Sequence, residues 1–98
     1  MSEQVYVGCV IVEENSVERL VKSKLFDGQD FEIRTPYWSV VPVTDSPTKA
    51  AWLLVEVLGK DEKNDKIFVK LPAPSLSLGH NVVVAKNNTA SPSEVEPT

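Results

Sequence analysis

The 98-residue chain contains one cysteine and one histidine. A single thiol cannot form an internal disulfide, which agrees with a reducing compartment. A structural zinc site needs four Cys or His ligands, so zinc is excluded. Nucleophilic catalysis needs a base beside a Ser or Cys, and only His80 supplies an imidazole. We therefore expect Cys9 to be an inert structural residue, and we expect no metal site and no enzymatic activity.

Glycine and long apolar runs are also scarce. The four glycines are scattered and match none of the glycine-rich phosphate-binding patterns, which argues against a nucleotide cofactor. The longest continuous apolar run, residues 50–55, is far shorter than the roughly 20 residues that a membrane span needs. The first residues lack the pattern of a secretory signal. We expect a cytoplasmic protein without a cofactor and without a membrane segment.

The charge balance is mildly acidic, with ten basic and fourteen acidic residues and a net charge of −4. Sequence-independent binding to nucleic acid draws on clustered Lys and Arg, so the sign of this charge disfavours it. A protein partner or self-association is the preferred expectation.

The length is enough for one hydrophobic core. We expect residues 1–86 to form a single small domain. Residues 87–98 are rich in Pro, Ser, Thr and Glu and offer little apolar surface to bury. We therefore predict a disordered C-terminal tail over 87–98.

Several segments have the composition of β-strands. Residues 5–12 are apolar on both alternating faces, which is typical of a central strand, and Gly8 within them indicates a bulge or a close neighbour. Residues 31–34, 38–43 and 81–86 are further strand candidates, and Pro42 predicts an edge position for the second of these.

One segment after the first strand has helical periodicity. Asn15 is a candidate cap, and Val17, Leu20, Val21 and Leu25 recur at helical spacing. We therefore predict a short helix over 16–25 that buries these four side chains.

Residues 45–59 support two interpretations. Pro47 and Gly59 suit the two ends of a helix, whereas the polar residues 60–65 between two apolar segments suit the turn of a hairpin. We prefer a strand over 50–58, paired antiparallel with 66–71. The predicted fold is β-rich α+β, a small barrel or bent antiparallel sheet of about six strands with one short helix after the first strand. The alternative is a βαββαβ ferredoxin-like sandwich.

Two sets of residues are candidate binding sites. Arg34, Tyr37 and Trp38 flank a proline bend, where the aromatic rings are either part of the core or an exposed anchor for a protein partner. Alternation places Lys66, Phe68 and Lys70 on one outward face. An aromatic ring between two cations can stack a base and hold its phosphates, or the lysines can simply keep a sheet surface soluble.

These observations favour a non-enzymatic protein-binding or oligomer-forming domain that uses Arg34, Tyr37 and Trp38. The competing hypothesis is a small β-barrel that binds nucleic acid through Lys66, Phe68 and Lys70. An enzyme of unknown type ranks third.

Overall fold

The computed structural model describes residues 3–75 and 78–95, which form a β-barrel with additional strands. The strands are β1 (Gln4–Glu14), β2 (Glu18–Lys24), β3 (Asp30–Pro36), β4 (Val40–Pro42), β5 (Ala50–Asp61), β6 (Lys66–Ser75), β7 (Gly79–Ala85) and β8 (Thr89–Ala90). Four three-residue 3-10 turns separate some of them: η1 (Tyr37–Ser39), η2 (Glu62–Asn64), η3 (Lys86–Asn88) and η4 (Pro92–Glu94). Within the described part of the chain there is no helix long and apolar enough to cross a membrane.

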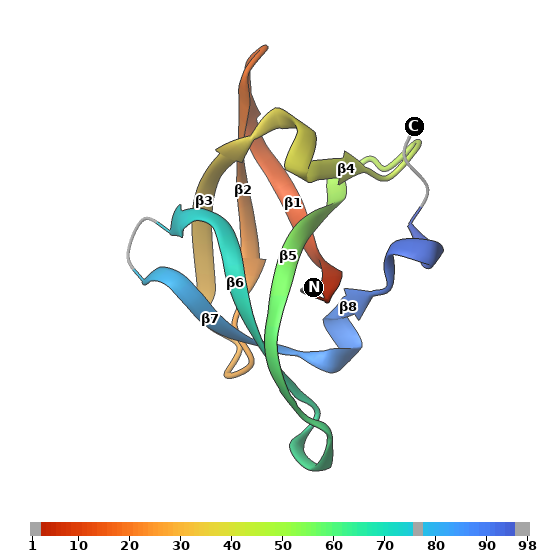
Figure 1. Cartoon of the computed structure of the whole chain (residues 1–98). Coiled ribbons are helices and arrows are strands. Elements are labelled where there is room, and N and C mark those ends of the chain that lie inside the picture. Colours follow the sequence, from red (N-terminus) through yellow and green to blue (C-terminus); the bar gives the residue numbers. More distant parts are fainter. Residues whose placement is uncertain (1–2, 76–77, 96–98) are drawn as a thin grey trace.

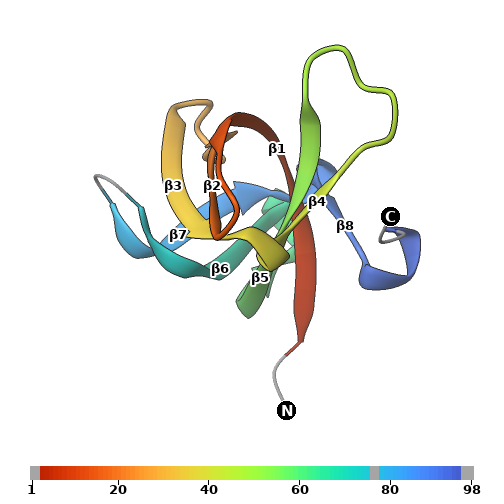
Figure 2. The same cartoon turned by 90° about the horizontal axis from the view of Figure 1, so that it is seen from above.

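Five strands close the barrel in the order β1, β2, β3, β6, β5 and back to β1 (Figures 1 and 2). Strand β1 is central, as its two apolar faces predicted, because β5 pairs with one edge and β2 and β8 with the other. Strand β4 continues the sheet beyond β5, and its Pro42 lies in a strand with only one partner. Strand β7 extends the sheet beyond β6. The barrel expected from the sequence is thus observed, with more strands than predicted.

The core follows the alternation of side chains along each strand. One face of every long strand points into the barrel, and fifteen apolar residues form a single buried cluster there. These residues are Val5, Val7, Cys9, Val21, Phe31, Ile33, Val40, Ala51, Leu53, Val55, Ile67, Val69, Leu71, Val82 and Val84. Branched residues predominate in this cluster because their stiff side chains suit a pleated surface.

The helix predicted over 16–25 is wrong, because these residues contain strand β2. The side chain of Asn15 accepts hydrogen bonds from the backbone amides of Val17 and Glu18, both at 2.9 Å. This is how an N-cap residue acts, but here it closes the turn between β1 and β2. Val17 is 71% exposed instead of buried, whereas Val21 is fully buried. The backbone of β2 pairs with β1 on one edge and β3 on the other, and these ladders outweigh the local helical pattern.

The strand predicted over 50–58 is confirmed as part of β5. Its last residues pair antiparallel with β6, from Glu56 opposite Lys70 to Asp61 opposite Lys66. Turn η2 links the two strands, and Asp65 ends that turn with a φ of 56°. The second helix of the βαββαβ alternative is therefore absent, and that alternative is wrong.

The described part of the C-terminal segment lies on the barrel. Strand β8 pairs with Tyr6 and Val7 of β1, and Val95 is buried after η4. This placement differs from the disorder expected for 87–98, and residues 96–98 lie outside the described part. Truncation after Lys86 distinguishes an ordered segment from a disordered one.

Candidate functional site

The short turn η1 displays the two aromatic residues that the sequence singled out. Tyr37 is 42% exposed and Trp38 is 71% exposed, so neither belongs to the core. The turn lies between β3 and β4 at one end of the barrel (Figure 1). A small domain has few large apolar residues to spare, which makes an indole left in water a feature that calls for an explanation.

A buried arginine on the neighbouring strand β2 holds this turn in place. Arg19 of β2 is only 5% exposed. Its Nη1 atom donates to the carbonyl oxygens of Tyr37 at 3.2 Å and Val40 at 2.7 Å, and its Nε pairs with Glu14 at 2.8 Å. The guanidinium carbon lies 3.6 Å from the centroid of the Tyr37 ring, a cation–π contact. One side chain therefore fixes both ends of η1 and one face of Tyr37.

Further hydrogen bonds fix the turn independently of Arg19. The hydroxyl groups of Thr35 and Ser39, both fully buried, lie 2.6 Å apart. Ser39 Oγ also donates to the carbonyl oxygen of Pro36 at 2.7 Å, and the amide of Tyr37 donates to Val17 at 3.0 Å. Trp38 is thus presented on a backbone that is already ordered, which reduces the entropy lost when a partner binds.

Trp38 also forms one wall of a groove of about 390 Å³. The apolar part of the groove includes Leu54 and Pro72. Its polar lining consists of Gln4, Glu56, Lys70 and His80. The imidazole Nδ1 of His80 lies 3.4 Å from the carbonyl oxygen of Leu71. The lining therefore combines apolar and polar side chains, as protein-binding patches usually do.

The groove follows a gap in the sheet. Strand β4 pairs with β5 only as far as Leu53, and β6 begins to pair with β5 at Glu56. Leu54 and Val55 therefore pair with β1 on one edge and face the groove region on the other. A gap of this kind offers a bound segment both side-chain and backbone contacts.

Arg34 is not part of this groove. It lies on β3, where its guanidinium pairs with Glu18 at 3.6 Å and Glu13 at 3.9 Å. The structure therefore brings together Tyr37 and Trp38, and it places Arg34 in an ion network on β1, β2 and β3.

The alternation predicted for β6 is confirmed. Ile67, Val69 and Leu71 are buried, while Phe68 is 39% exposed. The three outward residues do not form one site, however. Lys66 and Phe68 line a groove of about 370 Å³ with Phe26 and Leu78, whereas Lys70 lines the Trp38 groove.

Acidic residues accompany both lysines of this set. Across the β5–β6 ladder, Lys66 lies opposite Asp61 and Lys70 lies opposite Glu56. The ammonium of Lys66 also lies 4.9 Å from the centroid of the Phe26 ring. The phosphate-binding potential of these lysines is therefore reduced by their own neighbours.

Cys9 and His80 belong to different parts of the molecule. Burial raises the pKa of the Cys9 thiol to about 12, with nearby Arg19 opposing the shift. His80 instead lies at the exposed rim of the Trp38 groove. Over residues 3–75 and 78–95, no three His, Cys, Asp or Glu side chains cluster as metal ligands do.

Sequence reasoning missed several residues of the site. The helix predicted over 16–25 gives Arg19 and Val17 no contact with η1. Leu54 is outward-facing once β5 is a strand, so alternation was a usable signal for it. Pro72 and Phe26 line their grooves from the irregular part of β6 and from the turn after β2, and no pattern in the sequence assigns either residue to a binding surface.

Comparison with known proteins gives no relative to guide the assignment: no family model, no curated protein and no solved structure matches this chain.

Proposed function

We propose that the chain is a non-enzymatic protein-binding domain that holds its partner at Trp38 and the adjoining groove. The observation that carries the proposal is the 71% exposure of Trp38 on a turn whose backbone is fixed by buried hydrogen bonds. Tryptophan is among the residues that contribute most to binding energy at protein interfaces. Rigid presentation adds affinity because little further order is imposed on binding.

The neighbouring exposed residues extend the same surface. Val17 is 71% exposed, and its carbonyl oxygen accepts the hydrogen bond from Tyr37. The partner side chain enters the groove between Trp38 and Pro72, while the polar rim sets its orientation. The partner is a second protein or a second copy of the chain, and the first measurement below separates these two cases.

The competing function is binding of nucleic acid through Lys66, Phe68 and Lys70. The opposed acidic residues and the division of this set between two grooves disfavour it. Titration with single-stranded and duplex oligonucleotides at about 50 and 200 mM salt tests it, because phosphate contacts weaken steeply over that range. Micromolar binding that collapses at the higher salt would replace the protein-binding proposal.

We also place the protein in the cytoplasm. The support is its one cysteine, which is buried as a free thiol in the barrel and needs no oxidising compartment.

The test begins with the purified chain. Sedimentation of the wild type and of Trp38→Ala over a range of concentrations measures self-association. If the wild type is monomeric, both proteins are used as bait in extracts of the source cells, and captured proteins are identified by mass spectrometry. The captured protein is then produced in pure form and titrated against each variant.

Leu58→Ala is the matched control, since Leu58 is 50% exposed on β5 and does not line the Trp38 groove. We expect Trp38→Ala to weaken binding by roughly 2 kcal/mol or more, and Leu58→Ala to leave it unchanged. Equal binding by wild type and Trp38→Ala in both experiments would refute the proposal.

A further inference from the structure

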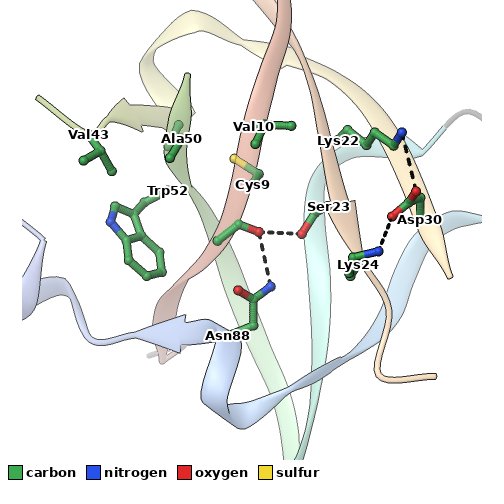
Figure 3. Close-up of a pocket in the computed structure, with 12 residues that line it drawn as sticks. Cys9, Val10, Lys22, Ser23, Lys24, Asp30, Val43, Ala50, Trp52 and Asn88 are labelled. Atoms are coloured by element: carbon green, nitrogen blue, oxygen red, sulfur yellow. Dashed lines mark hydrogen bonds and ion pairs between the residues drawn. The ribbon is translucent and has the colours of Figure 1, made fainter. Parts of the chain in front are cut away.

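A third groove, separate from the Trp38 groove and from the groove lined by Phe26 and Phe68, runs over the outer surface of β1, β2 and β5 (Figure 3). Its volume is about 560 Å³, and none of its lining residues belongs to the Trp38 groove. One wall is apolar, the other is charged, and the floor is formed by Gly8 and Val10. This asymmetry indicates a ligand that is itself apolar on one side and polar on the other.

The apolar wall is built around Trp52. This half-buried residue lies opposite Val41 in the β4–β5 ladder, so its backbone is held between two strands. Val43 and Ala50 lie beside it, joined by a backbone hydrogen bond of 2.9 Å. Such a wall offers an aromatic platform for a flat apolar surface.

The opposite wall carries three charged groups in contact. Asp30 of β3 pairs with Lys24 at 2.9 Å and with Lys22 at 3.5 Å. The hydrogen bond from Lys24 lowers the pKa of Asp30, so this carboxylate is an acceptor at neutral pH. Asp30 thus pairs with both lysines of this wall, which leaves a net charge of about +1 on the three groups. The wall thus contains both strong donors and a strong acceptor without a large net charge.

The floor supplies a neutral polar group between these walls. The carbonyl oxygen of Gly8 accepts hydrogen bonds from Ser23 Oγ at 2.6 Å and Asn88 Nδ2 at 3.3 Å. The second bond orients the Asn88 amide, whose oxygen points toward the Trp52 side of the groove in Figure 3. Because Gly8 itself carries no Cβ, the Asn88 side chain can lie directly above the strand.

We propose that this groove binds a carbohydrate, with the apolar face of a sugar ring on Trp52 and its hydroxyl groups on Asp30, Lys22 and Asn88. The charges on the wall favour a carbohydrate over a ligand that carries phosphate. A nucleotide phosphate would meet the Asp30 carboxylate, which already pairs with both lysines, whereas a neutral hydroxyl group uses donors and the acceptor equally well.

The test uses the intact chain labelled with ¹⁵N and the disaccharides maltose, cellobiose, lactose and N,N′-diacetylchitobiose at millimolar concentrations. AMP and inorganic phosphate are titrated in parallel. We expect at least one disaccharide to shift the backbone amide of Gly8 and the side-chain amide of Asn88. In a Trp38→Phe variant, Trp52 is the one tryptophan left, and its fluorescence should change over the same concentrations.

Variants then assign the binding to the groove. Trp52→Ala should weaken it about tenfold or more, which corresponds to about 1.4 kcal/mol. Asp30→Ala should also weaken it, and this exposed side chain can be removed without disturbing the core. Gly8→Ala would displace Asn88 and should weaken binding, whereas Gly59→Ala is the matched control because its nearest neighbour is 3.8 Å away.

Three results would overturn the proposal. The first is that none of the four disaccharides shifts any amide signal. The second is that AMP or phosphate, and not the sugars, shifts the signals of Lys22 and Lys24. The third is that both Trp52→Ala and Asp30→Ala bind sugar as the wild type does. Because Trp38 lies outside this groove, none of these results affects the proposed protein-binding function.

Discussion

The amide oxygen of Asn88 lies 2.5 Å from the point that a Cβ atom on Gly8 would occupy. The glycine thus leaves room for the Asn88 side chain, and its backbone makes no special demand, since it lies in β1 opposite Trp52 of β5 with a negative φ. The close neighbour that this glycine indicated in the sequence is a side chain eighty residues further along the chain. This contact ties η3 to the middle of β1.

We expect Gly8→Ala to destabilise the protein by roughly 1 to 3 kcal/mol through overpacking. In an Asn88→Ala background the same change should cost less than about 0.5 kcal/mol, because the space is then free. Urea unfolding of the wild type, the two single variants and the double variant measures this coupling. Additive effects of the two substitutions would show that the contact is not maintained in solution.

Replacement of Arg19 should loosen the turn that carries Trp38. Arg19→Ala leaves the carbonyl groups of Tyr37 and Val40 without their buried donor, and we expect a cost of roughly 2 to 5 kcal/mol. Arg19→Lys should recover only part of this loss, because an ammonium cannot reproduce the fork of donors. Thermal unfolding monitored by near-UV circular dichroism measures both effects. Full recovery by lysine would indicate that charge alone matters at this position.

A pair of valines tests whether β2 is a strand. Val21→Ala should cost roughly 2 to 3 kcal/mol, since this side chain is fully buried. Val17→Ala should change stability by less than about 0.5 kcal/mol, since its side chain is 71% exposed. Chemical denaturation of the wild type and the two variants measures these changes in the free energy of unfolding. Similar losses of stability in Val17→Ala and Val21→Ala would instead support the predicted helix, in which both side chains are buried.

The Cys9 thiol should be unreactive in the native protein. Burial raises its pKa to about 12 from an ordinary value of 9.0, so the folded state holds the thiol neutral where the unfolded state ionises. The contribution of this thiol to the free energy of unfolding is therefore constant below pH 9.0, and it is lost as the pH rises toward 12. Labelling by a thiol reagent at about pH 8 should require denaturant, since the thiolate is the reactive form. Rapid labelling under native conditions would contradict the burial of this residue.

Removal of residues 87–98 tests the position of the C-terminal segment. The truncation deletes Asn88, β8 and the buried Val95, and each lost kcal/mol lowers Tm by about 4 to 8 °C in a domain of this size. We expect a decrease of several degrees in calorimetry. A melting temperature that does not change would agree with the disordered tail that composition suggests.

The strands of the second half were predictable because their signals are local. Alternation along Ile67, Phe68 and Val69 assigns an inner and an outer face without reference to the rest of the chain. The polar turn before it favours a hairpin with the preceding apolar segment, and the β5–β6 ladder confirms this interpretation over the helix that Pro47 and Gly59 also suit. Pro42 likewise predicted an edge strand, because a proline lacks the donor that an inner strand needs.

The first half was not predictable in the same way. The spacing of Val17, Leu20, Val21 and Leu25 suits a helix, but residues 18–24 have strand partners available on both edges. Local preference amounts to a few tenths of a kcal/mol per residue, whereas two shared ladders and a buried Val21 contribute more. Only the tertiary structure could decide between them.

Sequence by itself determined the class of the molecule: a small, mildly acidic, β-rich domain in which Tyr37 and Trp38 are candidate contact residues. Tertiary structure alone decided that Trp38 is exposed, that Arg19 supports it, and that Asn88 fills the space above Gly8. The physical reason is distance along the chain. Alternation and turn chemistry act between residues a few positions apart, whereas these contacts join segments that meet only when the barrel closes.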